Sequence, residues 1–498
     1  MSHTNRLLQA IFIGVSPILA SCVGTPKVNG VAGSSPAPNV PWTPPADAIK
    51  PEPLISPAMV NAVPPDLQQR LQALTIADVV DLALRNNPAT HASWSQARAS
   101  ADFLGSARGA YYPELNASVT GSRIKSPASN ARPAGERTDY GPAMSLNYLL
   151  MDFGGRSGSV EAARQQLFAA NLTHNATIQN TVLDALTAYF NYVATIALFA
   201  AERTAIAEAQ ASLNAAQQRN RVGLATIADV LQARTALSQE QLTLETTQGL
   251  VQAARGGLAA ALGLPANLPF DLAPNTGPFP VRILTDSVDN IINAALRNRP
   301  DLAAARARAE AAYSQVRVTR AAALPSLNLG GTGSRLYSSP STFAGPSYNL
   351  NLGLSIPLFN GFSHQYDIAA AKAQADAISA LAEQTRQDVV TEVFVSYYRL
   401  QTAQQRAATA DDLLQSAEQS AQVAAGRYKE GVGSILDLLT AQTALANARA
   451  QRVQSRWAWY TSLAQLARDA GVLGVHGDTP FSFSPDTLSR PVPIPPSK

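Results

Sequence analysis

The chain is poor in charged residues and in cysteine. Of its 498 residues, 15% are Asp, Glu, Lys or Arg, whereas soluble domains average about 25%, so we expect a polar but largely neutral surface. The net charge of +3 is small for this length, and no dense Lys/Arg patch with interleaved aromatic residues occurs, which argues against a nucleic-acid partner. A single cysteine excludes an internal disulfide framework.

Recognisable enzyme chemistry is also missing. There is no Walker A sequence, and "DFGG" at 152–155 occurs without the other kinase motifs. The histidines show no metal-ligand spacing; they are His3, His91, His174, His364 and His476. We therefore expect no enzyme, no cofactor and no metal site, and any energy-consuming work must be done by a partner.

The N-terminus has the pattern of an export signal. After Arg6, "LLQAIFIGVSPILASC" is an apolar run too short to span a bilayer, and small residues precede Cys22, which predicts a signal peptide at 1–21. Leu19 to Cys22 resemble the bacterial lipobox, whose cysteine is acylated and becomes the first mature residue. A buried cysteine is the alternative, but this one lies at the export boundary, so we expect acylation of Cys22. Val23 rather than an aspartate follows it, which favours sorting to the outer membrane.

Between two segments rich in proline, the chain repeats itself. We expect the acylated cysteine and a Pro-rich tether at 22–72 and a Pro-rich tail at 471–498. In the body, "ALRNNP" at 83–88 returns as "ALRNRP" at 295–300, and "AYFNY" at 188–192 is matched by "SYYRL" at 396–400. The sequence thus predicts two repeats, 73–282 and 283–470.

Each repeat is predicted to contain a β-hairpin, at about 113–152 and about 325–358. In "YNLNLGLSIPL" (348–358) apolar residues alternate with Asn, Gly and Ser over the length of a transmembrane β-strand. A half-buried strand of a soluble sandwich has the same period. Four such strands among very long helices do not suit a sandwich, so we favour membrane strands.

The helices expected after the hairpins are exceptionally long. From 155 to about 222, and from 363 to about 430, there is no proline and little glycine, so each stretch predicts one helix of about 68 residues, or ~100 Å. Their Ala- and Gln-rich composition suggests that no 20-residue window is apolar enough for lipid. We therefore expect them to lie in water, packed as coiled coils.

The same helix–turn–helix motif closes both repeats. "RVGLATIADV" and "KEGVGSILDL" share a glycine, Gly223 or Gly431, and an aspartate six residues later, Asp229 or Asp437. Glycine permits the left-handed backbone that ends a helix, and an aspartate in a first helical turn interacts favourably with the helix dipole. That structural role is one interpretation of the aspartates. The other is an anionic ring around the axis of an oligomer, which would attract cations.

The paired turns, hairpins and long helices resemble the TolC family of outer-membrane channel-tunnels, also called outer-membrane efflux proteins, over about residues 75 to 470. The resemblance implies a mainly α fold with a membrane β part, in a homotrimer whose 12-stranded β-barrel continues into an α-helical periplasmic tunnel. Four strands cannot close a barrel alone, which also calls for further copies. The implied function is a passive exit duct for efflux, working with a periplasmic adaptor and an inner-membrane pump. A type I protein-secretion duct and a non-conducting, lipid-anchored coiled-coil scaffold remain alternatives.

The resemblance also implies roles for the two turns. Residues expected to dock the adaptor are Val222, Gly223, Leu224, Gly431, Val432 and Gly433. In the family the closed entrance is held by an aspartate, a tyrosine and an arginine; Asp229 and Tyr428 match the first two, but Gly433 occupies the arginine position. A second family aspartate is Thr440 here. Closure is therefore expected to depend on Asp229, Tyr428 and Asp437, helped by Arg221 or Lys429.

Overall fold

The computed structural model describes residues 71–127, 135–273, 287–339 and 344–473. The predicted signal peptide, the acylation site Cys22, nearly all of the tether and most of the tail lie outside these residues. Within them, the packed body starts at Leu71 and continues to Leu473, which are 5% and 1% exposed. Residues 71–74 pair with 271–273 through short backbone hydrogen bonds, such as that from the amide of Leu74 to the carbonyl of Asp271 at 2.9 Å.

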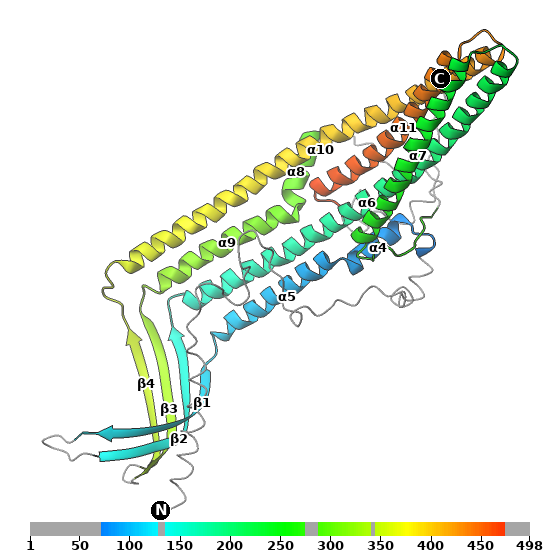
Figure 1. The fold of residues 1–498 in the computed structure, drawn as a ribbon. Helices are drawn as coiled ribbons and strands as arrows, with labels where there is room; N and C mark the ends of the chain where they lie inside the picture. Colours follow the sequence, from blue (N-terminus) through cyan, green and yellow to red (C-terminus); the bar gives the residue numbers. More distant parts are fainter. Residues whose placement is uncertain (1–70, 128–134, 274–286, 340–343, 474–498) are drawn as a thin grey trace, which may run out of the picture. The chain divides into compact units, whose positions relative to one another are not determined.

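The described body contains the same series of elements twice (Figure 1). The first series is α4 (Ile76–Asn86), α5 (Pro88–Gly109), β1 (Glu114–Ser126), β2 (Gly135–Met151), α6 (Gly155–Arg221) and α7 (Ile227–Ala261). The second is α8 (Val288–Asn298), α9 (Pro300–Ala321), β3 (Ser326–Ser339), β4 (Gly345–Ser355), α10 (Ser363–Lys429) and α11 (Ile435–Asp469). The four helices of each series have 11, 22, 67 and 35 residues. This equality of lengths makes the internal repeat visible in the backbone.

The two predicted long helices, α6 and α10, form the framework of the body. At 67 residues each, they extend about 100 Å at 1.5 Å per residue. Helix α6 packs against α5, α7, α9 and α11, and α10 packs against α8, α9 and α11. The buried positions are mostly small residues, such as Ala209, Ala216, Ala417 and Ala421. Small side chains let helix backbones approach closely, so many modest contacts stabilise the seams in place of one thick core.

One expectation about these helices is wrong for α6. By length and composition, α6 contains an 18-residue window apolar enough to cross a membrane, and 33% of that window is buried. The reason is a local aromatic core. Phe190 stacks on Trp457 at 5.9 Å and on Tyr460 at 5.6 Å between ring centroids, and Tyr189 beside it is 2% exposed. Tyr189 and Phe190 therefore serve contacts between helices, whereas most of the apolar window is not buried.

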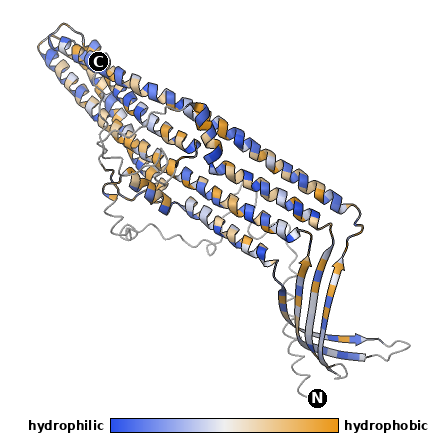
Figure 2. Cartoon of the chain, turned by 180° about the vertical axis from the view of Figure 1, so that it is seen from behind, coloured by the Kyte–Doolittle hydropathy of each residue, from blue (hydrophilic) through white to orange (hydrophobic). Residues whose placement is uncertain are grey.

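The strands form one antiparallel sheet in the order β1-β2-β3-β4. Both predicted hairpins are present, and pairing of β2 with β3 joins them; at that seam the rings of Tyr140 and Tyr337 stack with centroids 5.4 Å apart. Figure 2 shows hydrophobic and hydrophilic residues interleaved along the strands. Val119, Tyr348 and Leu350 are 80%, 92% and 72% exposed. The sheet thus presents bare apolar side chains, and its outer strands β1 and β4 each pair on one side only within the described chain.

Candidate functional site at the helical turns

The two predicted turns end their helices in the same way. After α6, Gly223 has φ +76° and the Leu224 amide donates to the carbonyl of Arg219 at 2.8 Å. After α10, Gly431 has φ +80° and the Val432 amide donates to the carbonyl of Arg427 at 3.0 Å. Both are Schellman turns, in which a left-handed residue lets the chain reverse while the last helical carbonyls keep hydrogen bonds. Glycine is the residue that adopts this backbone at least cost.

The two aspartates stabilise the starts of the returning helices. The carboxylate of Asp229 accepts the Thr226 amide at 2.8 Å, while the Thr226 hydroxyl accepts the Asp229 amide at 3.2 Å. Asp437 and Ser434 make the same pair of bonds at 3.4 and 3.1 Å. These are capping boxes, which satisfy amides that a helix leaves free at its first turn. Within the described residues, neither carboxylate forms an ion pair, so each is held by its own turn.

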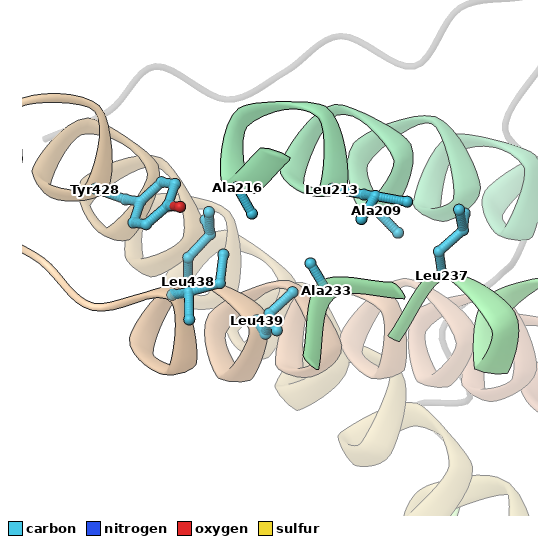
Figure 3. Packing of buried hydrophobic residues seen from close by; sticks show 9 residues of the cluster. Ala209, Leu213, Ala216, Ala233, Leu237, Tyr428, Leu438 and Leu439 are labelled. Carbon is cyan, nitrogen blue, oxygen red and sulfur yellow. The ribbon is translucent and has the colours of Figure 1, made fainter. Parts of the chain in front are cut away.

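Four helices meet beside the turns in a small apolar core (Figure 3). Its buried members come from α6, α7, α10 and α11 and point toward one another; they are Ala209, Leu213, Ala216, Ala233, Leu237, Tyr428, Ile435, Leu438 and Leu439. The core fixes the position of the α6–α7 turn against the α10–α11 turn. A polar bond adds to it, because the Ser212 hydroxyl donates to the side-chain oxygen of Gln442 at 3.0 Å.

Tyr428 is the polar member of this core. Its side chain comes from the last turn of α10, and the residue is 6% exposed. Burial raises the pKa of Tyr428; the positive charge of Arg219 opposes this rise and the negative charge of Asp229 adds to it. Within the described chain, the buried hydroxyl oxygen has no hydrogen-bond partner. A buried polar atom without a partner costs stability.

An arginine that the sequence analysis did not select contacts Tyr428. The guanidinium of Arg219 donates to the Tyr428 carbonyl at 2.6 Å and lies 4.9 Å from the centroid of its ring. Arg221 and Lys429, the cations expected to help, are exposed instead. The repeat marks Arg219 and Arg427 as equivalent, since both stand four residues before a turn glycine, but it does not predict which of them contacts the other turn. The structure therefore brings Tyr428 near Asp229 and Arg219, whereas Asp437 is engaged within its own turn.

The ends of the turns are apolar and open. Val222, Leu224 and Val432 are 69%, 70% and 69% exposed. Gly433 has no left-handed backbone, but a Cβ there would be crowded, because it would stand 3.0 Å from the Cβ of Arg427 and 3.1 Å from the amide nitrogen of Tyr428. Among the described residues, no group of three or more His, Cys, Asp or Glu could hold a metal ion. The site can thus offer apolar contacts and a few fixed charges.

Known proteins share this arrangement of repeats and turns. The model of the outer membrane efflux protein family matches residues 79–264 and 291–472. Protein CyaE of Bordetella pertussis is 33% identical over 434 residues, covering 85% of this chain and 90% of the relative. The toluene efflux pump outer membrane protein TtgC of Pseudomonas putida is 26% identical over 370 residues, covering 72% and 75% of the two chains.

Solved structures show the same fold. The outer membrane protein VceC of Vibrio cholerae superposes with a TM-score of 0.72 at 21% identity, covering 81% of this chain and 97% of that one. The Campylobacter jejuni CmeC outer membrane channel gives a TM-score of 0.72 at 19% identity, covering 81% and 87%. Together with the family match over both repeats, these findings establish that the chain belongs to the outer membrane efflux protein family, with its place in the outer membrane and its helical part in the periplasm.

Proposed function

We propose that three copies of this chain form the outer-membrane exit duct of a tripartite efflux system. Three sheets of four strands would close into a 12-stranded barrel, and the helices would continue it as a periplasmic tunnel. The duct is passive, because an inner-membrane pump supplies the energy and a periplasmic adaptor connects the two. Acylated Cys22 adds an anchor to the inserted barrel.

The observation that carries this proposal is the open sheet. Strands β1 and β4 are the outer strands of the four-stranded order, and apolar side chains such as Val119 and Tyr348 are 80% and 92% exposed. A bilayer provides no hydrogen-bond partners for free strand edges, so only a closed barrel is stable there. Pairing β1 of one copy with β4 of the next removes every edge, and the apolar side chains then face lipid.

A groove along α10 gives independent support for several copies. It lies between α10 and α11, has a volume of about 1080 Å³, and includes Phe394 and Tyr398, which are 49% and 45% exposed. The two exposed aromatic rings beside this groove offer a contact surface to a second copy of the chain. A neighbouring copy would cover it as the helices assemble around the tunnel.

The turns supply the entrance and the docking surface in this proposal. Val222, Leu224 and Val432 offer exposed apolar contacts to the adaptor, while Gly223, Gly431 and Gly433 keep the turns narrow. Asp229, Tyr428 and Asp437 surround the entrance, repeated in each subunit. The cargo is a class of small molecules, a choice supported by relatives whose names describe toluene, antibiotic and pyoverdine export.

Two measurements on the purified full-length protein test the proposal. Native mass spectrometry should give a trimer, and reconstitution in a planar bilayer should give discrete, long-lived ion conductance. A conducting trimer supports the duct. A stable assembly that never conducts across several preparations would instead favour the coiled-coil scaffold and overturn the proposal.

A further inference from the structure

Arg219 makes contacts that extend from one repeat to the other. It lies in the last turn of α6, yet its guanidinium donates to the carbonyl of Tyr428 at 2.6 Å and stands 4.9 Å from the centroid of that ring. One of its terminal nitrogens is 3.3 Å from where a Cβ on Gly431 would be. The side chain therefore contacts both the end of α10 and the turn that follows it. We call these interactions the cross-turn contact.

The equivalent arginine of the other repeat behaves differently. Arg427 corresponds to Arg219, since both precede their turn glycine by four residues. Its guanidinium donates to the carbonyl of Val432 at 3.5 Å, within its own turn. Around Gly223, a Cβ would meet nothing within 4 Å, whereas at Gly431 it would meet Arg219. Of these two equivalent arginines, it is thus Arg219 of the first repeat that links the turns.

The chemistry of the cross-turn contact suits a tie between helix ends. The carbonyl of Tyr428 belongs to the last turn of α10, where the helix dipole favours a positive charge. It accepts the Gly431 amide at 3.1 Å and, with its second lone pair, the guanidinium of Arg219. The planar guanidinium can donate to that carbonyl and lie over the aromatic ring at once, which a lysine cannot do equally well. Among the described residues, Arg219 forms no ion pair with a carboxylate, so the carbonyl and the ring are its principal partners.

We propose that Arg219 is a positioning residue that ties the α6–α7 turn to the α10–α11 turn within one subunit and so holds the tunnel entrance narrow. The effect at the entrance rests on the proposed function, whereas the tie itself does not. Moving the two turns apart would break the bond to Tyr428 and uncover its ring. Arg219 thus supplies a cation to the α10–α11 turn from the other repeat.

Hydrogen exchange tests the tie without any assumption about conduction. In the full-length Arg219→Gln protein, the amides of residues 428–432 should exchange about five- to tenfold faster, although the substitution lies in the other repeat. Arg427→Gln is the matched control, and it should leave the amides of residues 222–226 at the wild-type rate. Arg219→Lys should restore part of the protection. Unchanged exchange at 428–432 in Arg219→Gln, or equal effects across the turns in both variants, would overturn the tie.

Conductance in planar bilayers tests the role at the entrance. Arg219→Gln should raise the mean single-channel conductance several-fold, and Arg427→Gln should leave it near the wild-type level. Faster exchange with unchanged conductance would overturn the role at the entrance and leave the tie standing. A wild-type protein that conducts nothing would refute the duct, while the exchange data would still decide on the tie. A circular-dichroism spectrum and trimer mass equal to the wild type exclude misfolding as the cause.

Discussion

The two repeats have the same backbone but different polar interiors. Their helices have equal lengths, both turns carry a left-handed glycine, and both returning helices start with a capping box. Yet Arg299, 4% exposed, stands where the first repeat has Asn87. Conversely, Glu202 and Glu240 of the first repeat occupy the positions of Ala410 and Ala448 in the second. The two repeats thus share their turn glycines and helix caps, and buried polar residues distinguish one repeat from the other.

The charged cluster of the second repeat joins four helices. Arg299 at the start of α9 bonds Asp301 and, on α10, Glu392. The carboxylate of Glu392 also accepts a hydrogen bond from the guanidinium of Arg468 on α11 at 3.1 Å. The same guanidinium donates to the side-chain oxygen of Asn180 on α6 at 2.9 Å. In the first repeat Asn87 only caps its own helix, since its side-chain oxygen accepts the Ala89 amide at 2.9 Å. We therefore expect substitutions of Arg299 and of Asn87 to lower the free energy of unfolding by different amounts.

The largest effect is expected from removing the arginine of this cluster. Arg299→Met should lower the free energy of unfolding by about 3 kcal/mol, because it leaves two carboxylates without their buried partner. Both carboxylates reach solvent, with side chains 33% and 44% exposed, which keeps the cost at the lower end. Asn87→Ala, the matched change, should cost about 1 kcal/mol as a lost helix cap. Urea unfolding followed by circular dichroism compares them; equal losses would contradict the asymmetry.

The same variant should change the response to acid. Burial alone would raise the pKa of Asp301, but the hydrogen bonds and charge of Arg299 lower it below its ordinary value near 3.8. A lowered carboxyl pKa contributes stability that is present above the unfolded pKa and is lost as pH falls through the folded one. Wild-type protein should therefore lose stability below about pH 4. The Arg299→Met variant should lose less stability than the wild type below about pH 4. If both proteins lose the same stability on acidification, Arg299 is not the cause of the lowered pKa of Asp301.

A second pair of variants compares two glycines that have the same backbone conformation but different space around them. Gly263 and Gly223 both have positive φ, +68° and +76°. A Cβ at Gly263 would stand 2.5 Å from the carbonyl oxygen of Asn86, whereas at Gly223 it would meet nothing within 4 Å. Gly223→Ala should thus cost about 1 kcal/mol from left-handed strain, and Gly263→Ala about 2 kcal/mol or more because the α4–α5 junction must also move. Similar melting temperatures for the two would refute this difference.

A third comparison separates the two interpretations of Asp229. The sequence "TIAD" occurs at 75–78 and at 226–229, and both copies form a capping box. Asp78→Ala and Asp229→Ala should each cost about 0.5–1 kcal/mol in helix stability. If Asp229 also faces the entrance, only Asp229→Ala should alter cation block in planar bilayers. Identical conductance and block in both variants would leave capping as the whole role of Asp229.

The sequence predicts the long helices, hairpins and turns because their causes are local. Absence of proline from 155 to 222, alternation in 348–358 and glycine before a reversal each act within a few residues. The capping box of Asp229 was also readable, since Thr226 precedes it by three residues. Pairing of β2 with β3 and the contact of Arg219 with Tyr428 join residues about 200 positions apart. Such contacts depend on how the two repeats pack, which one repeat's pattern does not contain.

The smallest effect is expected at the glutamates of the first repeat. Burial raises the pKa of Glu202, and the negative charge of Glu240 adds to the rise. Burial likewise raises the pKa of Glu240, with a further contribution from Glu208, although Arg449 of α11 pairs with Glu208 at 2.9 Å. A folded pKa above the unfolded value near 4.5 means that the folded state binds more protons, so stability falls as pH rises through that window.

Glu202→Gln should remove this loss, because the amide keeps the size of the side chain without its charge. The free energy of unfolding of the variant should match that of the wild type at about pH 4 and exceed it at about pH 7, by less than about 1 kcal/mol. Glu245→Gln on the exposed side of α7 is the control and should follow the wild-type curve throughout. Curves for Glu202→Gln and wild type that stay parallel across this range would show that the negative charge of Glu202 costs no stability at neutral pH, and this difference between the repeats would then be neutral.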